Sequence, residues 1–260
     1  MRLSKSNRVS YQELTTQSTP PSTATWQPMP HHKVMTTVVE EVRNQGLNID
    51  EIKYQIVPVK NSKYPDMFTT MYMESDNGTF RNMLGIRNSH NKRFGAAACS
   101  GSSVIVCSNG CFSGDHQISA KHTPNVEINF VQRVQNMIQE VKQSWVYNEH
   151  RYNGYKDREL SSRDFHEILG EAVVSNAILP SKARKVYEEY INPRHDDFKD
   201  RNAWSAFNAF TEIHKESPIQ PHQAATRGIQ LHGVFDRFCA ENIKTQVNQP
   251  EELTTLLALN

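Results

Sequence analysis

The residues best suited to chemistry lie in a segment, 77–114, that contains no Asp or Glu. It carries four cations in a chain whose formal net charge is only +1. Such a surface attracts anions, and neutral donors and aromatic rings beside it add hydrogen bonds and stacking faces for a nucleic acid. In and beside this segment we predict nucleic-acid contacts at Arg81, Arg87, Asn88, His90, Lys92, Arg93, Phe94 and Lys121. The alternative to a nucleic-acid surface is a solvated hairpin, with the acids that balance its charge elsewhere in the fold.

A metal site and a covalent nucleophile are weaker candidates. Two cysteines and two histidines fall within sixteen residues, at Cys107, Cys111, His116 and His122. Zinc prefers such ligands, but the Cys-x3-Cys spacing is loose, and a cysteine that ends an apolar strand packs as a small hydrophobe. Ser89 and His90 are neighbours on a strand, so their side chains point to opposite faces. The glycines match no phosphate-binding loop. We therefore expect no metal, no cofactor and no catalytic residue.

Composition and charge narrow the class of protein. Hydrophobic residues make up 37% of the chain, and no stretch approaches the roughly 18 consecutive apolar residues of a membrane span. The N-terminus lacks the apolar centre of a signal peptide, so we expect a cytoplasmic protein with reduced cysteines and no membrane partner. Residues 1–125 hold 13 Lys and Arg against 9 Asp and Glu, whereas the remainder holds 16 against 19. The basic half is the one that carries the candidate contacts.

The spacing of apolar residues predicts the elements that would position these contacts. Residues 1–30 are rich in Pro, Ser and Thr, which is typical of a flexible arm. A helical face follows over 31–46. Alternating residues predict strands over 53–60, 67–74, 80–89, 94–100 and 102–108, with a tight turn between the last two. Short connections favour a mostly antiparallel, meandering sheet.

Beyond residue 122 the pattern is helical. Apolar residues recur every three or four positions over 126–145, and further helices are expected over 165–173, 181–190, 203–215 and 221–240. The prediction is an α+β fold, in which a mostly antiparallel sheet of about five strands packs on helices and the C-terminal half is helical. We assign residues 1–30 to the arm, 31–245 to a single domain, sheet-rich over 50–110 and helical over 124–240, and 246–260 to a tail.

Two blocks of sequence carry a resemblance to a known family. The first contains Ile86-Arg-Asn-Ser-His-Asn-Lys-Arg-Phe-Gly95 and is followed by Lys-His-Thr at 121–123. The second is Asn202-Ala-Trp-Ser-Ala-Phe-Asn-Ala-Phe-Thr-Glu212. Both resemble the phage- and plasmid-borne family called domain of unknown function 932, with departures at Asn91 and Ser108, where an acid is expected. The resemblance implies a fold, a mobile-element origin and hence the host cytoplasm, but no activity.

The expected function is non-catalytic nucleic-acid binding, of a single-strand binding or annealing type. One basic surface is short for a polyanion, so we expect a homo-oligomer in which the arm docks Trp26 on a neighbouring subunit. Two other classes stay open: a protein that inhibits a host defence or host enzyme by contact, and an enzyme that acts on nucleotides at an unrecognised site. A pair between Glu212 and Arg87 is a guess from chemistry. Residues 151–158 could form a second basic-aromatic patch, but we favour an amphipathic loop between helices.

Overall fold

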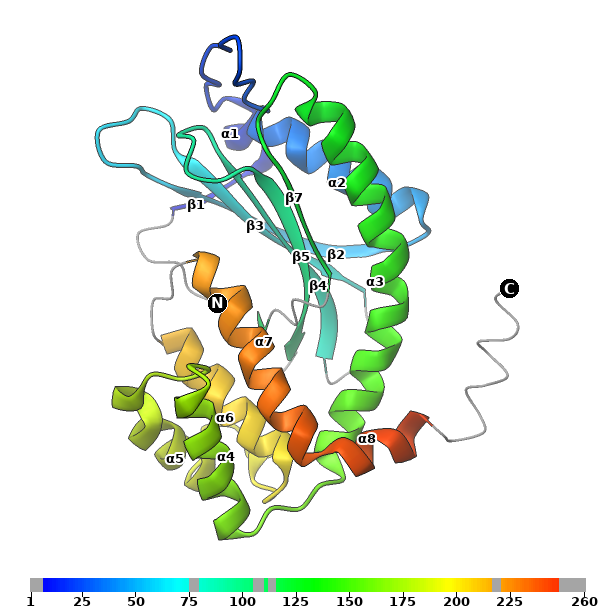
Figure 1. Ribbon diagram of the computed structural model, residues 1–260, viewed down its shortest axis with the longest axis vertical. Helices are drawn as coiled ribbons and strands as arrows, with labels where there is room; N and C mark the ends of the chain where they lie inside the picture. The colour runs from blue at the N-terminus through cyan, green and yellow to red at the C-terminus, as the bar shows by residue number, and fades with distance from the viewer. Residues whose placement is uncertain (1–6, 75–79, 105–109, 112–115, 217–220, 248–260) are drawn as a thin grey trace. The chain divides into compact units, whose positions relative to one another are not determined.

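The computed structural model describes residues 7–74, 80–104, 110–111, 116–216 and 221–247 of the 260-residue chain (Figure 1). Internal contacts divide the chain into two compact units. The first unit comprises Met1–Lys142 and Pro218–Ala225, and the second comprises Gln143–Ser217 and Thr226–Asn260. All the candidate contacts fall in the first unit, which is built on a β-sheet.

Within the described residues, seven strands form one antiparallel sheet (Figure 1). The strands are β1 (Asn7–Val9), β2 (Ile49–Val57), β3 (Asp66–Met73), β4 (Phe80–Ser89), β5 (Ala96–Val104), β6 (Gly110–Cys111) and β7 (Gln117–Ala120). Strands β1 to β5 lie in chain order, and β5 pairs with β6 and β7 along its other edge. The predicted α+β class and antiparallel meander are therefore confirmed.

Strand β5 differs from the prediction, because it is one continuous strand where two strands and a tight turn were expected. Gly101, the expected turn residue, lies inside β5 opposite Met83 of β4. Its neighbours Ser100, Ser102 and Ser103 are buried. A run of Gly and Ser is typical of a turn, but it also suits a strand that is closely flanked on both edges, because the small side chains leave room for neighbouring backbone.

Each of the six predicted helical segments contains a helix, although the helix that begins at residue 126 extends to 156 rather than 145, and two short helices, at 11–15 and 240–247, were not predicted. The helices are α1 (Tyr11–Thr15), α2 (His31–Asn44), α3 (Val126–Lys156), α4 (Ser162–Val174), α5 (Ala183–Ile191), α6 (Ala203–Glu216), α7 (Pro221–Phe238) and α8 (Ala240–Val247). Near their starts, α2 and α3 are joined by Lys33 and Glu127, 2.6 Å apart. Lys142, further along α3, donates to the Gln45 carbonyl just beyond the end of α2. The two helices therefore run side by side in the same direction.

The core of the first unit forms between these helices and the sheet. Helix α2 packs against β4, and the apolar stripes of α2 and α3 are buried together with side chains of the central strands. The buried residues include Val34, Val38, Phe130, Val134, Met67, Met71 and Leu84. A stripe at helical spacing and alternate residues of a strand can bury each other in this way, which fixes the sheet against the helical layer.

The second unit is helical, as predicted for the C-terminal half. Its centre is aromatic: the ring of Phe207 lies 5.5 Å from that of Tyr155 and 5.3 Å from that of Phe235. Helices α3 and α8 approach closely at Gly154, where an added Cβ would lie 2.7 Å from the Ile243 side chain. Glycine is needed there because the backbone of α8 occupies the space of a side chain.

The N-terminal segment has more regular structure than the predicted arm. Strand β1 pairs with β2, and Ser10 starts α1 with a capping box that includes Glu13. Leu14 of α1 is fully buried, which ties this helix to the first unit. Residues 16–30, which we call the strap, contain no helix or strand, yet Met29 near their end is buried. The predicted tail lies outside the described residues from 248 onward.

Candidate nucleic-acid interface

Three loops meet at one end of the sheet because the strands that they adjoin are neighbours. The register places Val57 opposite Asp66, Asp66 opposite Ser89, and Ala96 opposite Ala120. We call residues 58–66, 87–95 and 119–125 the basic end. Its cations are Lys60, Lys63, Arg87, Lys92, Arg93 and Lys121, and its one acid is Asp66. All of the cations are exposed except Arg87, which is half-buried.

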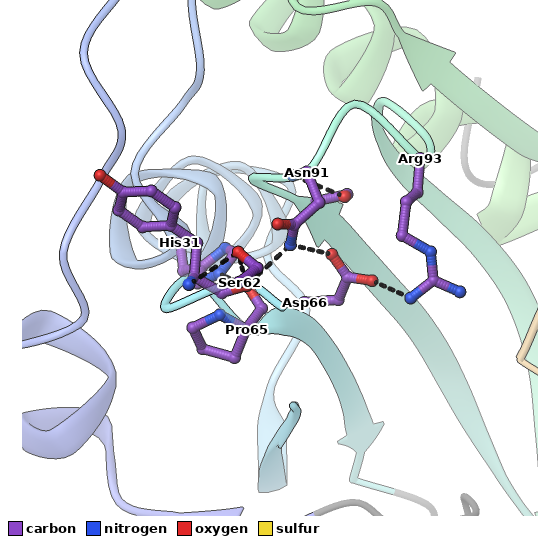
Figure 2. A network of polar contacts seen from close by, with 8 residues as sticks. His31, Ser62, Pro65, Asp66, Asn91 and Arg93 are labelled. Atoms are coloured by element: carbon purple, nitrogen blue, oxygen red, sulfur yellow. Dashed lines mark hydrogen bonds and ion pairs between the residues drawn. The ribbon is translucent and has the colours of Figure 1, made fainter. Parts of the chain in front are cut away.

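Asp66 ties two of these loops together from the inside (Figure 2). Its side chain is fully buried, and one carboxylate oxygen lies 2.8 Å from Nη1 of Arg93. The other accepts from Nδ2 of Asn91 at 3.2 Å, and the same amide donates to the Tyr64 carbonyl at 2.7 Å. The Arg93 side chain is nonetheless 51% exposed. Arg93 therefore fixes the loop through one nitrogen and presents the rest of its guanidinium to solvent.

Aromatic rings accompany the cations. Nζ of Lys63 lies 5.2 Å from the ring centre of Tyr64, and Nζ of Lys92 lies 4.9 Å from that of Trp26. The guanidinium carbon of Arg87 lies 5.0 Å from the ring centre of Phe94. Each pair is a cation–π contact, which holds a long basic side chain beside a flat apolar face. The basic end therefore combines phosphate-binding charge with rings on which bases can stack.

Arg81 does not belong to the basic end. It lies near the start of β4, whereas the basic end begins where β4 finishes. Its guanidinium forms ion pairs with Asp50 and Glu51, and it stacks 3.9 Å from the ring centre of Tyr72. Its charge is thus offset by two carboxylates, so we leave Arg81 out of the proposed contact surface.

Asn88 and His90, two other predicted contacts, are buried and hold the strap. Nε2 of His90 donates to the Met29 carbonyl at 2.7 Å, and Nδ2 of Asn88 donates to the same oxygen at 2.9 Å. A carbonyl only accepts, so the neutral His90 ring carries its proton on Nε2. These side chains therefore face the inside of the protein, and the predicted surface is reduced to the exposed cations and rings.

A third residue, His122, holds the strap from the neighbouring loop. Its carbonyl accepts from the Gln27 amide at 3.0 Å, and its Nδ1 accepts from the Met29 amide at 3.4 Å. The Trp26 ring lies 6.3 Å from that of His122 in an edge-on arrangement. Trp26 thus lies against its own chain, and its docking on a neighbouring subunit stays a prediction.

His31, His90 and His122 form a buried cluster beneath the strap. The rings of His31 and His90 are stacked, with centres 3.8 Å apart and planes 5° from parallel. Nε2 of His31 donates to the Pro65 carbonyl at 3.1 Å (Figure 2). Burial, with the neighbouring His90, lowers the pKa of His31 to about 3 and that of His122 to about 4. Burial also lowers the pKa of His90. The three rings are therefore neutral at pH 7.

The other candidate sites have different surroundings from those expected. Cys107 lies outside the described residues, and His116 contacts Glu140 at 3.2 Å. Across the part of the chain that is described, no three His, Cys, Asp or Glu side chains are grouped as metal ligands. Ser89 is buried and accepts from the Asn91 amide at 3.1 Å. Its hydroxyl is therefore occupied within the loop.

The expectations for Glu212 and for residues 151–158 are also corrected. In the second unit, the Glu212 carboxylate lies 3.5 Å from Arg194 and 3.3 Å from Lys215, which replace Arg87 as its cationic partners. Most of 151–158 belongs to α3 rather than to the favoured loop, and the alternative patch is largely interior, since Arg151 and Tyr155 are buried. Arg151 lies 3.0 Å from Asp236, so its charge is offset there.

Together the fold and the basic end define an α+β protein with a cationic, aromatic surface at one end of an antiparallel sheet. A family model described as a domain of unknown function, DUF932, matches residues 24–232, and the chain belongs to this family. The match begins inside the strap and covers the whole of the basic end. Neither the curated proteins nor the solved structures contain a match. No helix in the described ranges has the length and apolar character needed to cross a bilayer.

Proposed function

We propose that this protein, encoded by a phage or plasmid and acting in the host cytoplasm, binds single-stranded nucleic acid at the basic end without catalysing a reaction. The observation that carries the proposal is the charge of that end: six cations on three adjacent loops are accompanied by one acid, Asp66, which is buried and is paired with Arg93. Uncompensated cations at the surface release counterions from a polyanion when it binds, which supplies most of the affinity of non-specific binding.

The aromatic rings favour single strands over duplexes. Tyr64, Phe94 and Trp26 each lie beside a cation of the basic end. A base in a single strand has a free face that can stack on such a ring, whereas the faces in a duplex are already stacked on one another. Alternating cations and rings are what a protein needs in order to hold a strand without reading its sequence.

The width of the basic end favours self-association. It spans five adjacent strands, β2, β3, β4, β5 and β7, or about 20 Å at the usual strand spacing. A surface of that width contacts only a few nucleotides, and a homo-oligomer would repeat it along a strand. Light scattering of the free protein and of its oligonucleotide complex measures the mass. A monomer in both states would remove annealing by a multi-subunit assembly from the proposal.

Binding of a labelled oligo-dT to the wild-type protein, followed by fluorescence anisotropy at several salt concentrations, tests the function itself. Lys92→Ala combined with Lys121→Ala should weaken binding, and the slope of log K against log salt should fall by about 0.7 for each phosphate that the variant no longer neutralises. The matched control is Lys199→Ala combined with Lys244→Ala, which removes the same charge from exposed ion pairs of the second unit. The proposal fails if wild-type protein does not bind at low salt, or if both double variants behave alike. A contact inhibitor of a host protein would then be the better class.

A further inference from the structure

We infer that Trp26 is a base-stacking residue of the basic end, and that Asn88, His90 and His122 are positioning residues that hold the strap so that the ring is in place. The inference rests on the proposed function and deepens it. It assigns to the strap a part in binding. It also gives Asn88 and His90, for which the sequence predicted direct contact with nucleic acid, the role of holding the strap.

The Trp26 ring has a location suited to stacking. Trp26 lies against Lys92 and His122, two residues of different loops of the basic end, and it is partly exposed. The other two tryptophans, Trp145 and Trp204, belong to the second unit and are only 7% and 5% exposed. A partly exposed indole beside an exposed ammonium is suited to stacking on a base while the ammonium contacts the adjoining phosphate.

The strap is held by hydrogen bonds to its backbone just after Trp26. Three backbone groups, the amides of Gln27 and Met29 and the carbonyl of Met29, form four hydrogen bonds with Asn88, His90 and His122. The strap has no helix or strand of its own, so these bonds replace the partners that regular structure would provide. They fix the backbone immediately after Trp26. A ring that is already in place binds more tightly than one that must first be ordered.

Stacking of a base on Trp26 requires Lys92 to leave the face of the ring. Nζ of Lys92 lies over one face of the Trp26 ring in the free protein. Lysine has a long flexible stem, so the ammonium can move to a phosphate without any backbone change. A base then takes its place on the ring. The strap stays where it is, because none of its four hydrogen bonds involves Lys92.

Trp26→Ala and Trp26→Phe test the ring. Alanine should weaken binding of oligo-dT about tenfold with the salt slope unchanged, because the ring stacks on a base and neutralises no phosphate. Phenylalanine should recover most of the affinity. Tyr11→Ala, which removes another exposed aromatic ring of the N-terminal segment, is the control and should bind like wild type. Addition of oligo-dT should quench tryptophan fluorescence in wild type and much less in Trp26→Phe.

His90→Ala and His90→Gln test the positioning role. Alanine removes a donor to the Met29 carbonyl, so affinity should fall severalfold with an unchanged salt slope, and acrylamide should quench Trp26 more readily. Glutamine can still donate to that carbonyl and should restore both properties, and circular dichroism reports whether each variant is folded. Wild-type affinity in Trp26→Ala, or a loss in His90→Ala that glutamine does not rescue, overturns the inference while leaving wild-type binding and the proposed function intact. Failure of the wild type to bind overturns both.

Discussion

The histidine cluster makes the folded protein sensitive to acid, and the size of the effect follows from the burial of its rings. His31 and His122 have pKa values of about 3 and about 4 in the folded chain, against an ordinary value of 6.5. Above pH 6.5 the rings are neutral in both the folded and the unfolded chain, so the free energy of unfolding has its full value. Below that pH the unfolded chain takes up protons that the folded chain does not, and stability falls by about 1.4 kcal/mol per pH unit for each ring until the folded pKa is reached.

Between pH 8 and pH 5 each of these two rings therefore removes about 2 kcal/mol from the free energy of unfolding. His90 adds to the loss, because burial lowers its pKa as well. His214 of the second unit also contributes, since burial lowers its pKa to about 4. Urea unfolding at the two pH values measures the sum, and comparison of variants is needed to assign a part of it to one ring.

His122→Asn isolates one ring, because its amide oxygen can accept from the Met29 amide but takes up no proton in this range. The loss of stability between pH 8 and pH 5 should be smaller than in wild type by about 2 kcal/mol. Met29→Ala is the matched control: it removes buried side-chain atoms from the same site but no titrating group, so it should lower stability similarly at both pH values. An equal pH dependence in wild type and His122→Asn would refute the reasoning, since the ring would then accept a proton without cost to the fold.

Two further predictions concern the packing around the basic end, and urea unfolding measures both. Arg93→Ala leaves the fully buried Asp66 without its cation and should lower the free energy of unfolding by about 3 kcal/mol. Asp66→Asn in the same chain should recover much of that loss, because the amide oxygen still accepts from the loop. A double variant no more stable than the single one would contradict this. Gly95→Ala places a methyl 2.2 Å from the Ala120 carbonyl oxygen and should cost more than about 2 kcal/mol, whereas Gly170→Ala, with nothing within 4 Å, should raise stability by up to about 1 kcal/mol. Similar effects of the two alanines would show that β5 and β7 are not as tightly apposed as the structure has them.

Elements with a strong pattern of their own were predictable from the sequence. The helix expected over 31–46 is His31–Asn44, and the strand expected over 80–89 is Phe80–Ser89. Both bury one face along their whole length, so each turn or pair of residues repeats the same signal. The core residues of α2 and α3 follow from the same periodicity.

Elements that depend on their partners were not predictable. Strand β1 is three residues long, and β6 is two. Such short strands carry too little alternation to be recognised, and they are strands only because a longer strand offers them a free edge. Helix α1 is similar: its capping box is visible in the sequence, but the burial of Leu14 against the first unit is not. The expected turn at Gly101 failed for the same reason, since pairing on both edges overrides a local preference.

In the candidate site too, local features were predictable from the sequence and long-range contacts were not. The sequence located the cations, because an acid-free run is a local property. It did not show which cations are offset, because the partners are distant: Arg81 meets Asp50, 31 positions away, and Arg93 meets Asp66, 27 positions away. Ion pairs over such separations leave no spacing pattern in one sequence. Only the fold shows that Arg81 is compensated and that Lys92 and Lys121 remain exposed.

The buried polar residues Asn88, His90 and His122 are explained by the irregular backbone of the strap. The strap crosses the basic end without a helix or strand, so its backbone amides and carbonyls require partners from other parts of the chain. Apolar residues at 88, 90 and 122 would leave the Met29 amide and the Met29 carbonyl unpaired, at a cost of about 1–3 kcal/mol each. Asn88, His90 and His122 supply the partners with neutral donors and acceptors, and because hydrogen bonds are directional they also fix the strap in one position. Asn88 and His90, whose side chains suggested ligand contacts in the sequence, thus form hydrogen bonds with the protein's own backbone. The exposed cations and rings around them remain available to bind a ligand.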